Sequence, residues 1–177
     1  MTTTQDNGLA CVSAALGRSF DIKFIGGVGY VANLCASFVK EISLLSFLGE
    51  KRNEKKFILK NLNKKVNHNF LIKKNYFKIL KTRYIDEYKK SKIIGIYDIN
   101  DEPISSNEEN KFLSLLKKKL SKNDLVIITD YGHGIFTKKI RKLISNNKKK
   151  IFLNAQINSF SRGYHTVFKY KQVNTLV

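Results

Sequence analysis

A glycine-rich turn followed by an apolar-periodic segment constrains the fold of this chain more than any other feature. Residues 20–25 alternate in polarity, and the sequence GGVGYVANLCASFVKEISLLSFLG then runs from Gly26 to Gly49. This pattern predicts a short strand, a helix over residues 29–38 and a second strand at Ile42–Leu48. Because strand–helix–strand units normally build parallel sheets, we expect an α/β fold with a central, mainly parallel sheet and flanking helices.

The glycines of this turn admit three interpretations. At a helix start, free N–H groups and the helix dipole attract anions or sugar hydroxyls, and glycine lets a ligand come close. The residues from Gly27 to Ala32 also fit the dinucleotide fingerprint G-x-G-x-x-A, with Gly29 as its second glycine. Glu50 follows about twenty residues later, where a ribose-binding acid is expected. In the third interpretation the glycines only allow the helix to pack closely on the sheet.

The charge of the chain does not by itself indicate a nucleic-acid partner. A formal net charge of +19 would favour one, but 28 of the 33 basic residues are lysines scattered along the sequence. We therefore expect a solvated lysine surface and no specific nucleic-acid binding. Hydrophobic residues make up 42% of the chain, which is enough for a core. With no apolar run of membrane-spanning length and no secretory signal, we expect a soluble cytoplasmic protein without membrane contact.

The remaining sequence predicts further strands and helices within one α/β domain at residues 20–177, after a weakly structured lead-in at residues 1–19. Short aromatic or β-branched runs between residues 66 and 100 suggest successive strands. Ser105 or Ser106 with a following glutamate predicts a helix start. The sequence DLVIIT predicts a central strand that ends at the segment Asp130-Tyr131-Gly132-His133-Gly134. A helix at 137–145 and a strand at 148–154 follow.

Polar residues come directly after both of these last strands. Asp130 and His133 follow the first, Asn154 ends the second, and Gln156 lies just beyond it. Open α/β sheets bind ligands at the carboxyl ends of parallel strands, so these four residues are candidate ligand contacts. Without a ligand, they would cap the strand ends and the loops.

Five collinear stretches resemble the ribokinase-like (phosphofructokinase-B type) carbohydrate kinases. The resemblance is closest to the heptose-phosphate kinase domain of ADP-heptose synthases and related kinase–nucleotidyltransferase fusions. It implies a Rossmann-like α/β core with a small β-sheet lid, and residues 66–100 would contain the lid strands. The stretches are GGVGYVANLCASF (26–38), LKTRYID (80–86), IYDINDEP (96–103), DLVIITDYGHGIFT (124–137) and NAQINSFSRGYHTVFKY (154–170).

The resemblance implies an ATP-dependent, Mg²⁺-assisted transfer of a phosphoryl group to a hydroxyl of a sugar or sugar phosphate, such as heptose phosphate. Gly26 and Gly27 match the double glycine that approaches the sugar hydroxyls. Tyr30 stands where the family usually has an asparagine. Lys81 and Arg83 match a basic lid strand that can face a sugar phosphate, although a solvated strand face would look the same.

Further positions match family sites at the return from the lid and at the sheet edge. Asp98 matches an acidic position that reaches the substrate, and its simpler role is a turn cap. The segment from Asp130 to Gly134 matches the family's DYxKG, with His133 in place of the phosphate-pairing lysine. Neutral imidazole can hydrogen-bond a phosphate but supplies no constant charge at neutral pH.

Other family motifs are not found in these 177 residues. The Gly-Asp substrate motif does not occur before Gly26, and the Gly-Ala-Gly-Asp turn with the catalytic base does not occur before Val177. The chain therefore resembles the first half of a kinase, and we expect no catalysis by it alone. Homodimers through the lid or an exposed sheet edge are expected. The alternatives are a dinucleotide-binding module using Gly27, Gly29 and Glu50, and a noncatalytic kinase-like binding module.

Overall fold

The computed structural model describes most of the chain, which divides into two compact units. The described residues are 24–50, 52–74, 80–86, 88–98, 102–155, 167–171 and 173–176. One unit runs from Met1 to Asn100 and the other from Asp101 to Val177. The expected lead-in at residues 1–19, the start of the strand expected at 20–25 and Gln156 lie outside the described residues.

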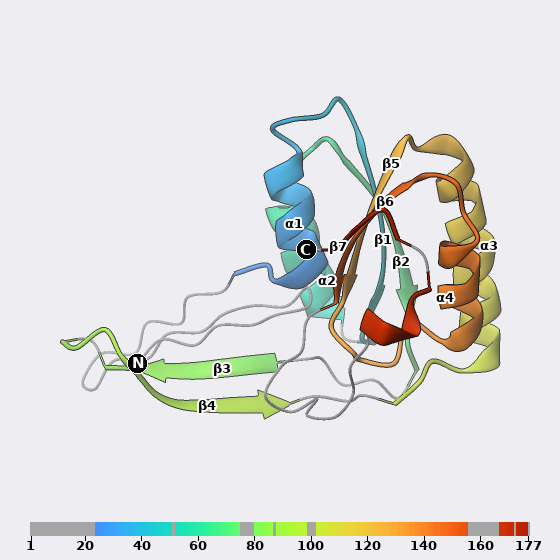
Figure 1. Cartoon of the computed structure of the whole chain (residues 1–177). Helices are drawn as coiled ribbons and strands as arrows, with labels where there is room; N and C mark the ends of the chain where they lie inside the picture. Colours follow the sequence, from blue (N-terminus) through green and yellow to red (C-terminus); the bar gives the residue numbers. More distant parts are fainter. Residues whose placement is uncertain are drawn as a thin grey trace. The chain divides into compact units, whose positions relative to one another are not determined.

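The first unit contains a two-stranded parallel sheet with helices α1 and α2 on one side of it (Figure 1). Every residue of β1 pairs in register with β2, from Ile42 opposite Val66 to Leu48 opposite Ile72. The predicted strand at Ile42–Leu48 is therefore confirmed, but its parallel partner β2 comes from the region at 66–100 that was expected to contain the lid strands. The elements are α1 (Gly27–Cys35), β1 (Ile42–Leu48), α2 (Arg52–Asn61) and β2 (Val66–Ile72).

Two small apolar clusters attach the helices to this sheet. Ala32 of α1 packs with Leu44 and Val66 of the strands, and Ile58 of α2 packs with Ile25 and Leu48. The buried face of α1 differs from the predicted one. The spacing of Val31, Leu34, Cys35 and Phe38 predicts an apolar face, but Leu34 is 52% exposed and Phe38 is 86% exposed. The small residues Gly29 and Ala32 face inward instead, because they let the helix come close to its neighbours.

The first unit also contains an antiparallel pair of strands, β3 (Leu80–Ile85) and β4 (Lys92–Asp98). The pair is a sheet of its own and does not hydrogen-bond to β1 or β2. Between the two strands, the carboxylate of Asp86 accepts hydrogen bonds from the N–H groups of Tyr88 and Lys89, at 2.9 and 3.0 Å. The strands of this hairpin are two of the runs predicted between residues 66 and 100, while β2 belongs to the parallel sheet.

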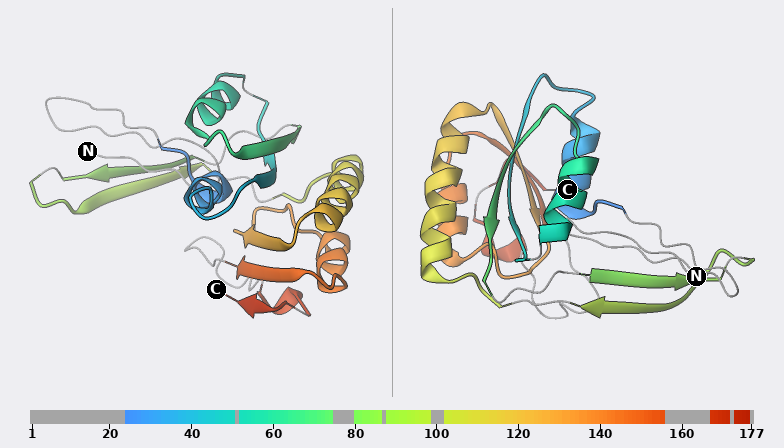
Figure 2. Two further views of the ribbon diagram at one scale, coloured as in Figure 1. Left: turned by 90° about the horizontal axis from the view of Figure 1, so that it is seen from above. Right: turned by 180° about the vertical axis from the view of Figure 1, so that it is seen from behind.

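The second unit is a three-stranded parallel sheet with strand order β5-β6-β7 and two helices on one face (Figure 2). Parallel pairing runs from Leu125 opposite Lys150 to Asp130 opposite Ala155, which confirms the predicted arrangement of these strands. The elements are α3 (Ser106–Lys122), β5 (Leu125–Asp130), α4 (Lys138–Ser145), β6 (Lys150–Ala155), the 3-10 helix η1 (Val167–Lys169) and β7 (Thr175–Leu176).

Local sequence signals explain where the two helices of this unit begin. Ser105 and Glu108 form a reciprocal capping box at the start of α3, as the sequence predicts. Thr137 caps α4 by accepting a hydrogen bond from the N–H of Ile140. Fully buried aliphatic side chains fill the space between helices and sheet. They are Ile140, Ile144, Ile151 and Leu153. Among the described residues, no helix is long and apolar enough to span a membrane.

Candidate functional site

The candidate site of the second unit is the turn that follows β5. Asp130 is the last residue of the strand and is only 4% exposed. Its Oδ1 accepts a hydrogen bond from the N–H of Gly132 at 2.9 Å, and its Oδ2 accepts one from the hydroxyl of Tyr170 at 3.0 Å. Both carboxylate oxygens therefore accept hydrogen bonds from other groups of the protein, and Asp130 stabilises the conformation of the turn.

Glycine is required at two positions of this turn. Gly132 and Gly134 have φ angles of 77° and 75°, in the left-handed region that other residues rarely adopt. The carbonyl oxygen of Gly134 accepts a hydrogen bond from the N–H of Ile104 at 3.1 Å. Between the glycines, His133 is 5% exposed, and its ring centroid lies 6.5 Å from that of Tyr131. The imidazole is thus positioned by the turn and largely shielded from solvent.

Tyr170 was not identified from the sequence as a candidate residue. Burial raises the pKa of its phenol well above the usual range, and the charge of Asp130 and the hydrogen bond to it act in the same direction. The ring of Phe136 lies edge-on to that of Tyr170, with a centroid distance of 6.4 Å. The phenol therefore stays protonated and donates to Asp130. No local pattern signals this contact, because the two residues are 40 positions apart in the chain.

Asn154 lies at the same edge of the sheet as Asp130 but on the other face. In the parallel register, Asn154 stands opposite Thr129, whereas Asp130 stands opposite Ala155. Side chains of successive residues in a strand point to opposite faces, so Asn154 shares a face with Thr129. The helices of this unit cover the face that carries Asp130, and the half-buried Asn154 lies on the opposite face.

The glycine-rich turn of the first unit begins α1. Gly26 is the N-cap residue and provides no side-chain cap, and Gly27 has a φ of 51°. Tyr30 is 54% exposed on the first turn of the helix. Packing explains the glycine at position 29, because a Cβ there would lie 2.7 Å from Cδ1 of Ile25. Close packing of α1 thus accounts for one of the three glycines.

The hairpin separates two of the residues predicted to bind substrate. Arg83 stands opposite Gly95, and Asp98 stands opposite Leu80. Since residues directly opposite each other share a face, Arg83 and Asp98 project from opposite faces of the hairpin. Lys81 stands opposite Tyr97 on the face of Arg83. The side chain of Lys81 lies outside the described residues.

Tyr97 is a second residue that sequence reasoning did not single out. Burial raises the pKa of Tyr97, but the hydrogen bonds from Arg83 and Lys92 and their positive charges together lower it below its usual value. The ammonium nitrogen of Lys92 lies 6.0 Å from the centroid of the Tyr97 ring. Two cationic side chains therefore meet at one phenol oxygen on the hairpin.

A third polar cluster joins α3 to the start of α4. Glu109, 7% exposed, accepts hydrogen bonds from the hydroxyl of Thr137 and from the ammonium group of Lys139. These bonds lower the pKa of the Glu109 carboxyl below its usual value. Thr137 also caps α4, so the cluster holds the end of the turn that began at Asp130.

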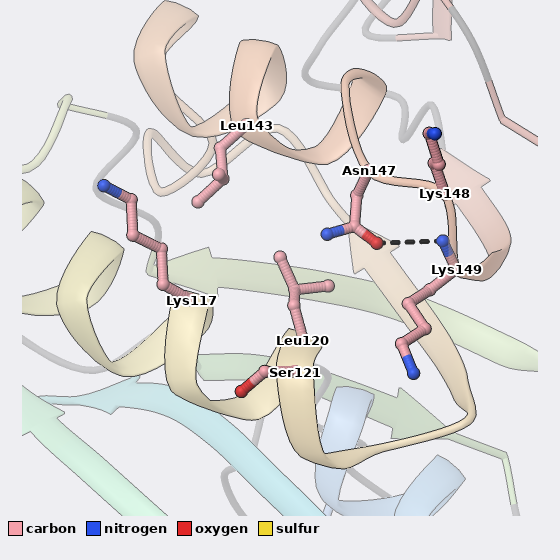
Figure 3. Close-up of a pocket in the computed structure, with 7 residues that line it drawn as sticks. All are labelled: Lys117, Leu120, Ser121, Leu143, Asn147, Lys148 and Lys149. Atoms are coloured by element: carbon pink, nitrogen blue, oxygen red, sulfur yellow. Dashed lines mark hydrogen bonds between the residues drawn. The ribbon is translucent and has the colours of Figure 1, made fainter.

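A cleft of about 480 Å³ lies at the opposite end of the second unit, where α3 and α4 end (Figure 3). Its three lysines come from α3 and from the connection between α4 and β6. The cleft is remote from Asp130, because the helix ends and the start of β6 lie at the amino edge of the sheet. Its lining residues are Lys117, Leu120, Ser121, Leu143, Asn147, Lys148 and Lys149.

Comparisons with known proteins give a distant relationship. No family model matches the chain. The Bifunctional protein HldE of Nitratiruptor sp. is 26% identical over 143 residues, which cover 78% of this chain and 29% of that protein. The Bifunctional protein HldE of Aliarcobacter butzleri is 27% identical over 154 residues, which cover 86% of this chain and 31% of that protein. The chain thus matches less than a third of the length of these relatives. The similarity supports a relationship to the ribokinase-like carbohydrate kinases that the motifs resemble.

Proposed function

We propose that this chain forms the sugar-binding side of a ribokinase-like carbohydrate kinase, with a sugar phosphate such as heptose phosphate as its ligand. In this proposal the two parallel sheets belong to a partial Rossmann-like core, and the hairpin β3–β4 is the lid. The observation that carries it is the turn after β5, where Asp130 accepts a hydrogen bond from Gly132, one of two left-handed glycines at the carboxyl edge of a parallel sheet. The distant similarity to HldE proteins supports the same family.

The proposed chemistry at this turn is recognition of hydroxyl and phosphate oxygens. Asp130 keeps the turn in shape through its bonds to Gly132 and Tyr170. His133 would hydrogen-bond a phosphate oxygen from the position of the family's lysine. Asn154, at the neighbouring strand end, would bind a sugar hydroxyl through its amide. Gly26 and Gly27 at the start of α1 would approach the sugar in the same way as the family's double glycine.

ATP and Mg²⁺ belong to the proposed function only through the resemblance. The part of the chain that the structure describes contains no group of three histidine, cysteine, aspartate or glutamate side chains that could hold a metal ion. We assign neither ATP nor Mg²⁺ to particular residues, and the proposal concerns binding of the sugar. Phosphoryl transfer is not attributed to any of these 177 residues.

The proposal is tested by titrating the purified chain with heptose phosphate in a calorimeter. Binding should weaken roughly threefold to tenfold in His133→Ala, since a neutral hydrogen bond contributes about 0.5–1.5 kcal/mol. His68→Ala is the matched control, because His68 is an exposed histidine on β2. Thermal melting of both variants shows that they are folded.

Two outcomes would reject the proposal. One is no binding of heptose phosphate by the folded wild-type chain. The other is saturable binding of NADH that Gly27→Ala and Glu50→Ala both weaken, which would favour the dinucleotide-binding alternative. Equal affinities in His133→Ala and His68→Ala would keep the sugar ligand but remove His133 from its site.

A further inference from the structure

Helix α1 lies in the longest uncharged stretch of the chain. No lysine, arginine, aspartate or glutamate occurs in residues 24–39, in a sequence of which 27% is charged. The one amide side chain of the helix, Asn33, is bound at the end of α2. It donates to the carbonyl of Asn61 at 2.7 Å and accepts from the N–H of Asn63 at 2.8 Å. A helix that is apolar on all sides is normally buried on all sides, so the outward face of α1 should also be covered.

Three large apolar side chains occupy this outward face. The side of α1 that faces the sheet has small, buried residues, whereas Tyr30, Leu34 and Phe38 are 54%, 52% and 86% exposed. After the last residue of the helix, the N–H of Phe38 donates to the carbonyl of Cys35 at 2.9 Å, so that the chain continues to turn up to Phe38. The three side chains follow one another at intervals of about one helical turn. We call them the apolar stripe.

The charge of the chain restricts what can cover the apolar stripe. The chain has a net charge of +19, and an acidic partner would be attracted to its lysines, none of which lies in residues 24–39. A second copy of the chain is repelled where the lysines of the two copies approach each other, and this repulsion is smallest at an uncharged surface. The apolar stripe is therefore the surface at which two copies can meet with the least electrostatic cost.

We propose that the apolar stripe is the contact surface of a homodimer. This surface is distinct from the hairpin and the sheet edges, and the assignment does not rest on the proposed function. A leucine between two aromatic residues suits an isologous contact of antiparallel helices, in which each pairwise contact occurs twice. Leu34 then packs on the partner's Leu34 at the twofold axis, and Tyr30 packs on the partner's Phe38. Such aromatic pairs contribute beyond the area that they bury.

The size of the apolar stripe determines the expected strength of the dimer. Two aromatic rings and one leucine from each copy would bury less than about 1,200 Å² in total, which is the range of weak and reversible complexes. Repulsion between two chains of charge +19 weakens the association further. Because salt screens this repulsion, the dimer should become tighter as the salt concentration rises.

The first test is sedimentation of the full chain over a range of protein and salt concentrations. Leu34→Gln should weaken dimerisation about tenfold or more, because each dimer loses two buried leucines. Leu59→Gln is the matched control, since Leu59 is a leucine of α2 that is 37% exposed and lies outside the apolar stripe. Thermal melting shows that both variants are folded. Three results would each overturn the proposal: a monomer at high micromolar concentration, equal weakening by the two variants, or a dimer that salt weakens.

The second test uses Cys35, which follows Leu34 and is partly accessible. In Cys11→Ser it is the one remaining thiol. A short bismaleimide should join two chains through it, since both copies of Cys35 would lie beside the twofold axis, and adding Leu34→Gln should prevent this. The control, Cys11→Ser/Cys35→Ser/Ser114→Cys, moves the thiol to an exposed position of α3 and should give little cross-linked dimer.

Two results of the cross-linking would contradict the proposal. Equal cross-linking through Cys35 and through the cysteine introduced at position 114 would show association without a defined surface. A Cys35 thiol that reacts only after unfolding, in a chain that sediments as a monomer, would show that another part of the same chain covers the apolar stripe.

Discussion

The hydroxyl of Tyr170 donates a hydrogen bond of 3.0 Å to Oδ2 of Asp130, and both side chains are more than nine-tenths buried. This hydrogen bond holds Tyr170, the residue after η1, against the carboxyl end of β5. The other carboxylate oxygen of Asp130 accepts from the N–H of Gly132. One aspartate therefore links the chain segment that enters β7 to the turn proposed to meet the ligand.

Tyr170→Phe should destabilise the chain by about 1–3 kcal/mol, because it leaves an oxygen of Asp130 buried without its donor. The ring contact with Phe136 is retained in this variant. Urea unfolding measures the change in free energy. Tyr88→Phe is the control, because the Tyr88 side chain is 98% exposed and its loss of a hydroxyl should be nearly neutral. Equal midpoints for the two variants would contradict the prediction.

The raised pKa of Tyr170 should also make stability depend on alkaline pH. Below pH about 10, the phenol is protonated in both the folded and the unfolded chain. Above that pH only the unfolded chain loses the proton, so the stability due to Tyr170 declines by up to about 1.4 kcal/mol per pH unit. The comparison is between wild type and Tyr170→Phe by urea unfolding from about pH 9 to about pH 11. The advantage of the wild type should shrink over this range, and a constant difference would speak against the assignment.

Glu109 should make the stability of the chain decrease as the pH falls into the acidic range. Its pKa is lowered by the bonds from Thr137 and Lys139, so its contribution to stability is complete above the unfolded pKa of about 4.3. The contribution is lost as the pH falls through the lower folded pKa. Glu109→Gln should therefore be less stable than wild type at neutral pH. The difference in free energy of unfolding between the two should become smaller at acidic pH. A gap that stays the same from neutral to acidic pH would show that the ionised carboxylate is not what stabilises the site.

The regular elements could largely be predicted because their signals are local. The capping pair Ser105 and Glu108 marked the start of α3, and the apolar run at 124–129 marked β5 within one residue. The inward face of α1 could not be predicted in this way. Its larger apolar residues indicated one face, but the distance to Ile25 selected the small residues Gly29 and Ala32.

The candidate site was predictable only at the level of strand ends. Asp130 and Asn154 do lie at one edge of the sheet, but the register places them on opposite faces. Tyr170 reaches Asp130 from 40 positions away in the chain, and Lys92 lies near Tyr97 where the strand pairing shifts between Tyr84 and Ile85. Neither contact follows from spacing along the chain, since each depends on tertiary or cross-strand geometry.

Ser105→Ala should cost about 0.5–2 kcal/mol through loss of the capping box. In the structure, the Ser105 hydroxyl accepts from the N–H of Glu108 at 3.4 Å, and the Glu108 carboxylate accepts from the N–H of Ser105 at 2.8 Å. Urea unfolding should show the loss. Ser114→Ala tests the same substitution at an exposed position inside α3, where alanine should be neutral or slightly stabilising. Similar changes in both variants would show that the cap contributes nothing.

Whether Gly29→Ala raises or lowers the free energy of unfolding should depend on the residue at position 25. Inside a helix, alanine is favoured over glycine by about 1 kcal/mol. In the wild type, however, the new Cβ would lie 2.7 Å from Cδ1 and 2.9 Å from Cγ1 of Ile25. That side chain is buried against Leu48 and Ile58 and has little room to shift, and such overpacking costs about 1–3 kcal/mol. The single variant should therefore be less stable than wild type. In an Ile25→Ala background the clash is gone, so adding Gly29→Ala should stabilise the chain in urea unfolding. Destabilisation of similar size in both backgrounds would mean that Gly29 is needed for a reason other than packing against Ile25, such as close approach of a ligand.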